Sequence, residues 1–276
     1  MGTVATVRGG RRAARTAANS SAMDVAARWG LAARGVLYCL VGLLAARIAF
    51  GGGEQADNGG ALRELSGQPF GAFLVWAVGI GIAGLALWRL SEALFGAAGP
   101  DGRKARKRLM SAGRAVFYGF TAYSMISFAA RGRGSGSSDA KSRDVTADAL
   151  GWPAGQWLVA VAGLAIAGAG GWIVIQAARR SFHKHLKHAR MSRLARRVVD
   201  VLGVVGGVAR GTLFAVAGVF AVRAALEFDP SQAKGMDDTL RTFADAPAGP
   251  WLLAAIATGL VLFGAFSLAL ARWRRV

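Results

Sequence analysis

The stretch LAARGVLYCLVGLLAARIAF, residues 31–50, decides the fold class of this chain. It is apolar except for two arginines, and about 20 residues at 1.5 Å per residue cross the ~30 Å hydrocarbon layer of a bilayer. Five further apolar runs of that length or longer follow, at Phe70–Phe95, Leu109–Ala130, Gly155–Ala178, Val198–Leu226 and Trp251–Ala271. The sequence therefore predicts an all-α integral membrane protein with six transmembrane helices.

The amino-acid composition agrees with this class. Of the 276 residues, 54% are hydrophobic, which is more than a soluble domain of this size normally uses. The excess lies mostly in Ala, Val, Leu and Gly, and small residues of this kind suit closely packed membrane helices. The single cysteine, Cys39, excludes an intramolecular disulfide and a zinc ribbon, and its apolar surroundings favour a packing role.

The net charge of +19 is distributed unevenly along the chain. Four segments and their flanks hold 25 of the 34 basic residues but only four of the 15 acids: the N-terminal tail, the turn 103–108, the run 179–197 and the C-terminal end. Because Lys and Arg stay on the cytoplasmic side of a membrane, both termini are predicted to be cytoplasmic. The same residues are expected to contact anionic lipid headgroups, and no nucleic-acid partner is predicted. The Arg-, Ala- and Gly-rich composition is typical of a bacterial gene, so we expect a multi-pass protein of the bacterial plasma (inner) membrane.

Several landmarks recur in the same order, which indicates an internal repeat. Each copy has an arginine followed eight positions later by a small residue, then a proline turn, and an aromatic residue nineteen positions after the proline. The landmarks are Arg34, Arg114 and Arg210; Gly42, Ala122 and Gly218; Pro69, Pro153 and Pro247; and Trp88, Trp172 and Phe266. Each copy is therefore predicted to contain one outward helix, an extracellular loop and one return helix.

The predicted organisation is a basic cytoplasmic tail at 1–22 followed by repeats at 23–98, 99–182 and 183–276, with a basic cytoplasmic linker at 179–197. An even number of spans returns each copy to the same orientation, so the copies are parallel repeats. We expect a pseudo-three-fold axis along the membrane normal to relate them. Short amphipathic helices are predicted in two outer loops, at Gly60–Leu65 and Met236–Phe243, whereas residues 131–138 of the second loop are typical of a flexible linker.

Four motifs in the first copy resemble a known bacterial family. They are Ala-Arg-Gly-x-x-Tyr at Ala33–Tyr38, Gly-Ala-Leu-Arg at Gly60–Arg63, Gln-Pro-Phe-Gly at Gln68–Gly71 and Leu-Trp-Arg at Leu87–Arg89. The chain resembles the membrane proteins of domain-of-unknown-function family 1206 over nearly its whole length. The resemblance implies paired-helix repeats, usually three per protein, and brings no activity with it.

Arg34, Arg114 and Arg210 are the strongest candidates for a binding site. A charge within a span costs about 2.5–3.5 kcal/mol and normally faces the protein interior or water. Related by a three-fold axis, the three side chains form a ring near the cytoplasmic side that could hold an anion or a lipid phosphate. Alternatively, each side chain extends to the cytoplasmic headgroups. Both interpretations stay open at the level of sequence.

Two further patterns concern packing and pairing. Gly203, Gly207 and Gly211 form two overlapping Gly-x-x-x-Gly steps, which are typical of a helix face in close contact with a neighbour. Glu92 follows Arg89 by three residues, which predicts an ion pair at a helix end.

The sequence contains no motif that predicts catalysis. No nucleotide-binding loop, metalloprotease motif or serine-hydrolase motif is present. His183, His185 and His188 lie in a basic stretch without Cys or carboxylate ligands, so no metal site is predicted and these side chains are expected to be solvated. We therefore expect no enzyme and no cofactor. The leading hypothesis is a non-catalytic envelope or scaffold protein that binds lipids or other proteins, and the alternative is a small anion- or solute-conducting channel or permease with an axial path.

Overall fold

The computed structural model describes residues 21–53, 55–68, 70–96, 104–131, 137–186 and 191–273. Within these ranges the chain forms helices and no β-strand, as the sequence predicts. The predicted tail at 1–22 falls almost wholly outside the described residues, and so do parts of the predicted linkers at 131–138 and 179–197.

The described elements repeat in the order long helix, short helix, long helix. The long helices are α2 (Ser21–Ala49), α4 (Gly71–Phe95), α5 (Ala105–Arg131), α7 (Gly155–Ala178), α8 (Arg193–Leu226) and α10 (Gly249–Trp273). The short helices between them are α3 (Asn58–Ser66), α6 (Ser138–Leu150) and α9 (Met236–Ala244), with two 3-10 turns, η1 (Ser181–His185) and η3 (Pro230–Gln232). Each predicted copy therefore contributes one outward helix, one short helix and one return helix.

Five of the long helices, α2, α4, α7, α8 and α10, are long and apolar enough to cross a membrane. Helix α5 has 27 residues and is also long enough, but its basic first turns and Arg114 make it less apolar than the others. Helices α2 and α8 begin before the predicted spans, at Ser21 and Arg193. An apolar run marks only the part of a helix that suits hydrocarbon, whereas backbone hydrogen bonding continues into the polar flanks.

The segments between the two long helices of each copy contain more helix than the sequence predicts. The two predicted amphipathic helices are confirmed as α3 and α9, which bury Leu62 and Leu240. In the second copy the chain forms α6, which is not among the predicted elements; the predicted linker at 131–138 precedes it and lies mostly outside the described residues. The Ser137 side chain caps this helix by accepting a hydrogen bond from the backbone N–H of Ala140.

The same backbone turn opens each return helix. Phe70, Ala154 and Ala248 have left-handed backbone conformations, with φ of 61°, 61° and 59°, and a glycine follows each of them. A Cβ on that glycine would lie 1.7–2.2 Å from a carbonyl oxygen of the preceding short helix. Only glycine fits so close an approach, so this turn fixes the direction of the return helix relative to the short helix.

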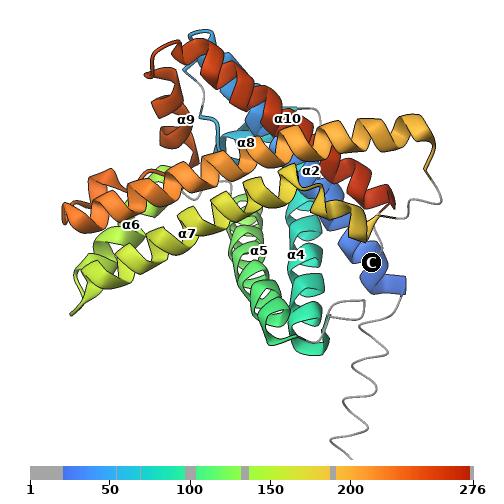
Figure 1. Cartoon of the computed structure of the whole chain (residues 1–276), viewed down its shortest axis with the longest axis horizontal. Helices are drawn as coiled ribbons and strands as arrows, with labels where there is room; N and C mark the ends of the chain where they lie inside the picture. The colour runs from blue at the N-terminus through green and yellow to red at the C-terminus, as the bar shows by residue number, and fades with distance from the viewer. Residues whose placement is uncertain are drawn as a thin grey trace, which may run out of the picture.

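The most extensive helix contacts join different copies. Helix α4 packs against α5, α7 packs against α8, and α10 comes back to pack against α2 (Figure 1). Within a copy, α2 contacts α4 and α8 contacts α10, whereas α5 and α7 make no comparable contact. The pairing order is closed, because each return helix packs on the outward helix of the next copy and the last return helix packs on the first outward helix.

Small residues at equivalent positions bring these helix pairs close together. The pairs are Gly35–Gly264 and Gly42–Ala257 between α2 and α10, and Gly211–Gly170 and Gly218–Gly163 between α8 and α7; a Cβ on the first residue would lie 2.8–2.9 Å from the carbonyl oxygen of the second. Between α4 and α5, the corresponding Ala122 is buried and a Cβ on Gly79 would lie 3.2 Å from Ile126. The small residue eight positions after each repeat arginine therefore allows the backbones to approach.

The predicted packing glycines divide between two neighbours. A Cβ on Gly207 would lie 2.6 Å from the Cβ of Ala177 in α7, and Gly211 faces the same helix. Gly203 instead faces the ring of Phe182 in η1, where a Cβ would lie 2.6 Å from the ring. The three glycines therefore lie at close contacts, but the contacts are made to two different elements.

Arginines cap the ends of two return helices. Arg28 in α2 donates to the carbonyl oxygens of Ala271 and Arg272 at 2.7 and 2.9 Å, and Arg108 in α5 donates to that of Ala93 at 2.7 Å. Each cap precedes the arginine of its repeat by six residues. Guanidinium groups at helix C-termini satisfy the last carbonyls and oppose the helix dipole. The caps also show that α2 is antiparallel to α10, and α5 to α4.

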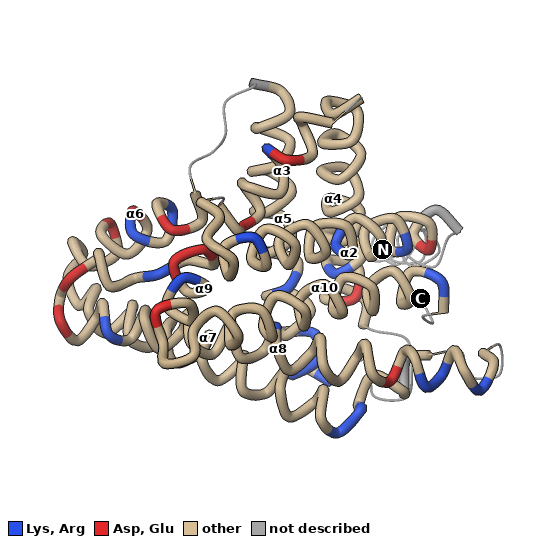
Figure 2. The backbone as a smooth tube through the Cα atoms, turned by 90° about the horizontal axis from the view of Figure 1, so that it is seen from above, with Lys and Arg blue, Asp and Glu red and all other residues tan. Residues whose placement is uncertain are grey.

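The three helix pairs run in different directions. In Figure 1, α7 and α8 lie across the view, α4 and α5 run downward, and α2 and α10 run obliquely. Acidic residues gather around α3, α6 and α9, whereas basic residues lie at the start of α8 and the end of α10 (Figure 2). Basic residues of α3, α6 and α9 lie among these acids, so both signs of charge occur around the short helices.

Candidate anion-binding site

Arg34 lies in the interior of the protein rather than at a headgroup surface. Its side chain comes from the middle of α2 and the residue is 8% exposed. Nε donates to the hydroxyl of Ser267 in α10 at 3.2 Å, and Nη1 donates to the hydroxyl of Tyr118 in α5 at 3.2 Å. The guanidinium carbon lies 5.3 Å from the centre of the Phe263 ring. Among the described residues, the oxygen partners of Arg34 are therefore neutral hydroxyls, and no carboxylate pairs with it.

Arg210 repeats this arrangement between another two copies. It is partly buried, and its Nε donates to the hydroxyl of Tyr38 in α2 at 2.8 Å. Its guanidinium carbon lies 4.9 Å from the centre of the Phe214 ring and 5.0 Å from that of Phe263. Aromatic faces attract guanidinium groups, but they do not neutralise the charge. Phe263 therefore lies beside both arginines.

The two bonds follow the order in which the helices pair. Arg34 of the first copy reaches Tyr118 of the second, and Arg210 of the third copy reaches Tyr38 of the first. The aromatic residue that would accept from Arg114 is Phe214, which has no hydroxyl. This difference explains why one arginine of the three lacks an equivalent bond.

Arg89 in α4 joins the group, although its position was predicted only as part of an ion pair. It is 5% exposed, and its Nη1 lies 2.6 Å from Oε2 of Glu92, which also accepts from the hydroxyl of Ser111 at 3.2 Å. The predicted ion pair near the end of a helix is thus confirmed, and it is buried. The Nε of Arg89 is buried and has no hydrogen-bond partner among the described residues.

Arg114 differs from the other arginines because its side chain is exposed on α5. It interacts electrostatically with Arg89, Tyr118, Arg210 and Glu92. The structure therefore brings Arg34 and Arg210 together in the interior and leaves Arg114 at the edge, so the predicted ring of three equivalent side chains is not symmetric.

We call Arg34, Arg89, Arg114 and Arg210 the arginine cluster. Glu92 is its sole carboxylate partner among the described residues. Buried charges are normally paired, because an isolated ion loses its hydration on burial. Four cations with one anion among aromatic rings and hydroxyls form an arrangement that can hold a further anion.

A second polar group joins the short helices to one another. The carboxylate of Asp57 accepts from the backbone N–H of Ser138 at 2.6 Å, and that of Asp139 accepts from Asp238 at 3.1 Å. The carboxylate of Asp237 accepts from Ala56 at 2.7 Å, which closes the circle. We call Asp57, Asp139 and Asp237 the carboxylate ring; each copy supplies one member, and all three are buried.

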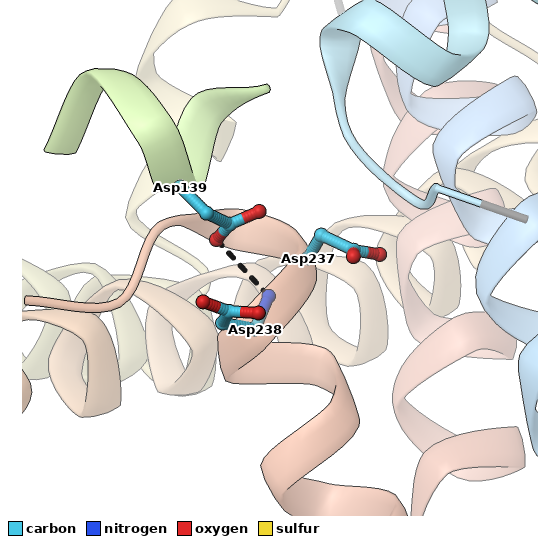
Figure 3. A group of neighbouring side chains, drawn as sticks. All are labelled: Asp139, Asp237 and Asp238. Carbon is cyan, nitrogen blue, oxygen red and sulfur yellow. Dashed lines mark hydrogen bonds between the residues drawn. The ribbon is translucent and has the colours of Figure 1, made fainter. Parts of the chain in front are cut away.

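Figure 3 shows how Asp139, Asp237 and Asp238 converge at the starts of α6 and α9. Their carboxylate oxygens lie within 4.8 Å of one another. Arg241 pairs with Asp237 at 2.9 Å, and Arg143 pairs with Asp238. These ion pairs and the backbone bonds to helix N-termini account for the acidic cluster within the protein itself.

The stability of the carboxylate ring is expected to depend on pH through Asp139. Burial, followed by the charges of Asp238, Asp237 and Asp57, raises the pKa of Asp139, against a backbone hydrogen bond that lowers it. A raised folded-state pKa means that the contribution to stability is present at low pH and is lost as pH rises through that pKa. We expect this contribution to raise the melting temperature of the wild type as pH falls from 7 toward the ordinary aspartate pKa of 3.8.

The Asp139→Asn variant should lack this rise, because asparagine keeps an acceptor for the Asp238 N–H but cannot titrate. Thermal unfolding of both proteins between about pH 4 and 7 measures the difference. A wild-type melting temperature that falls over this range in parallel with the variant contradicts the prediction.

His183 is not freely solvated, contrary to the sequence prediction. Its Nε2 lies 2.5 Å from Oδ1 of Asp200 in α8, and Arg180 lies 3.9 Å from the same carboxylate. The sequence predicted no ligand for this histidine within 179–197, and the partner lies just beyond that run. His188 and the side chain of His185 lie outside the described residues.

The helices and their order define an all-helical, multi-pass membrane protein built from three two-helix repeats. The chain belongs to the family described as Domain of Unknown Function (DUF1206), whose model matches it three times, at residues 29–96, 109–180 and 205–274. Each match starts within α2, α5 or α8 and ends close to the end of α4, α7 or α10. The resemblance predicted from the sequence motifs is thus confirmed.

A bacterial relative agrees with this assignment. The chain is 30% identical over 249 residues to the "Uncharacterized protein YxxB" of Bacillus subtilis (strain 168), and the match covers 87% of each chain. No solved structure matches the chain.

Proposed function

We propose that this protein is a non-catalytic membrane scaffold that crosses the bacterial plasma membrane six times and binds lipids or other proteins. The observation that carries the proposal is the closed order in which α4 packs on α5, α7 on α8 and α10 on α2. The same order recurs in the arginine–tyrosine bonds and in the carboxylate ring. A chain whose three copies are joined by these contacts suits a rigid membrane scaffold.

The six-span arrangement includes α5 as a span and places both termini in the cytoplasm. Its support is that α5 pairs along α4, which is apolar enough to cross the membrane, and that Arg108 caps the end of α4. The basic ends of α8 and α10 support the cytoplasmic orientation. The closed pairing order supports a pseudo-three-fold relation between the copies. The expected partners are anionic lipid headgroups on the cytoplasmic side, with no nucleic acid.

The alternative function is an anion-conducting channel or permease with a path between the copies. The convergence of Arg34 and Arg210 near the shared Phe263 ring favours this alternative, since buried cations attract anions. The two functions differ in flux. A scaffold whose interior is filled by side chains should not conduct.

Flux of chloride, phosphate and small solutes into proteoliposomes tests the proposal. We expect wild-type vesicles to match protein-free vesicles. The control is a variant with Arg34→Ala, Arg114→Ala and Arg210→Ala, which must first be shown to be folded by its thermal unfolding. Anion flux in the wild type that disappears in the folded variant contradicts the scaffold proposal and establishes the channel.

A further inference from the structure

The geometry points to a binding site for the phosphate of an anionic membrane lipid, formed by the arginine cluster and entered at Arg114. This inference rests on the proposed insertion of α5 into the membrane, and it specifies the ligand that the scaffold holds.

The charge of the cluster is not balanced within the protein. Arg89 is paired with Glu92, but within the described ranges the oxygen partners of Arg34 and Arg210 are the hydroxyls of Tyr118, Ser267 and Tyr38. A hydroxyl accepts a hydrogen bond without supplying negative charge. An anion beside these groups would offset the cost of keeping the guanidinium groups out of water.

The cluster also holds an unused donor. The Nε of Arg89 is buried and lacks an acceptor in the part of the chain that the structure describes, while the residue as a whole is 5% exposed. Buried donors without acceptors are rare in folded proteins, and a missing ion or ligand is one explanation. Guanidinium groups bind phosphate oxygens through paired, charge-assisted hydrogen bonds, so a phosphate suits this donor better than a halide does.

Access to the cluster is from the side of the molecule. Arg114 is exposed on α5, and Val116, Phe117 and Phe120 are exposed on the same helix, by 74%, 46% and 59%. Phe117 lies one turn after Arg114, whereas Val116 and Phe120 lie farther round the helix. An arginine with an exposed aromatic ring one turn away matches the two parts of a phospholipid, which are a charged phosphate and hydrocarbon chains. A soluble anion would match only the arginine.

The depth of Arg114 also suits a lipid phosphate. Arg114 follows the capping Arg108 by six residues, which is about 9 Å along a helix. An arginine side chain can extend over much of this distance toward the headgroup layer. The phosphate of a lipid in the cytoplasmic leaflet would therefore reach Arg114 first, and the buried arginines would lie behind it.

Binding of defined lipids to the full-length protein in detergent micelles tests the site. Melting temperatures are measured with added dioleoyl-phosphatidylglycerol, with dioleoyl-phosphatidylcholine, and with inorganic phosphate at the same concentration. We expect phosphatidylglycerol alone to raise the melting temperature, because a ligand that binds only the folded state stabilises it. Arg114→Ala should weaken this response by about tenfold or more in lipid concentration, as expected for the loss of a charged hydrogen bond. Arg114→Lys should give an intermediate response, since lysine keeps the charge but loses the paired donors.

Two controls separate this site from general attraction of anionic lipids. Arg223→Ala removes an exposed arginine near the C-terminal end of α8. The double variant Arg193→Ala and Arg197→Ala removes two arginines at the start of the same helix. Both should keep the phosphatidylglycerol response of the wild type. The inference is overturned if Arg114→Ala responds like the wild type, if phosphatidylcholine is as effective as phosphatidylglycerol, or if inorganic phosphate alone produces the full shift.

The readouts are independent of the flux experiment. If the protein does not distinguish the lipids, the lipid site is contradicted but the non-conducting scaffold is not. If the protein conducts anions, the scaffold is contradicted but the melting-temperature response to lipid is unaffected.

Discussion

Replacing Gly170 with leucine should lower the melting temperature of the protein by about 10 °C, which corresponds to about 3 kcal/mol of lost stability. A Cβ at this position would lie 2.3 Å from the backbone nitrogen of Ala215 and 2.7 Å from the carbonyl oxygen of Gly211. Backbone atoms in a helix cannot move aside as a side chain can. The two helices would have to separate, and α7 and α8 form one of the three most extensive pairs.

The neighbouring Gly171 provides a matched control on the same helix. A Cβ on Gly171 would have no neighbour within 4 Å, and leucine favours a helix over glycine by about 0.8 kcal/mol. We expect Gly171→Leu to be as stable as the wild type or slightly more stable. Thermal unfolding in detergent measures both variants. Equal losses of stability in the two would show that α7 and α8 are not in the contact described.

The second large effect concerns Glu92. Glu92→Gln should destabilise the protein by about 3–5 kcal/mol, because it leaves the buried guanidinium of Arg89 without its counter-ion. Glutamine keeps the size of the side chain and an acceptor for Ser111, so the loss reports mainly on charge. The measurement is thermal or chemical unfolding of the purified variant.

Two further variants test the cause of that loss. Glu64→Gln removes a carboxylate 3.9 Å from Arg47 in an exposed pair, and it should change stability by no more than about 0.5 kcal/mol. Replacing both members of the buried pair, Arg89→Met with Glu92→Leu, should recover most of the stability, because no unpaired charge remains. A double variant as unstable as Glu92→Gln would show that packing at these positions, and not charge, decides the result.

The repeat and the long helices could be predicted from the sequence because their signals are local. An apolar run can be recognised without knowledge of its neighbours. The proline turn before each return helix is also a local conformation, and it requires glycine because a Cβ would clash with the preceding short helix. Helix α6 was missed because its residues are polar and its cap depends on a single serine, Ser137. The predicted spans also missed the polar starts of α2 and α8.

The site could be predicted only in part, because it depends on which helices become neighbours. Arg34 and Arg210 were found from their place in the repeat, but nothing in the sequence pairs α10 with α2. Arg89 belongs to the Leu-Trp-Arg motif, but its burial beside the other arginines could be recognised only from the fold. The carboxylate ring was missed for the same reason, although the concentration of acids in the outer loops was visible in the charge distribution.

The central claim is that the chain crosses the membrane six times, with α5 as a span. Labelling of single cysteines with a membrane-impermeant maleimide in intact cells or spheroplasts tests it most directly, in a Cys39→Ala background. Outer positions are Ser66→Cys, Ala147→Cys and Ser231→Cys, and inner positions are Lys104→Cys and Ala178→Cys. We predict labelling at all three outer positions and protection of both inner positions until the membrane is opened. Protection of Ala147→Cys while Ser66→Cys is labelled would show that α5 does not cross, and would contradict the account.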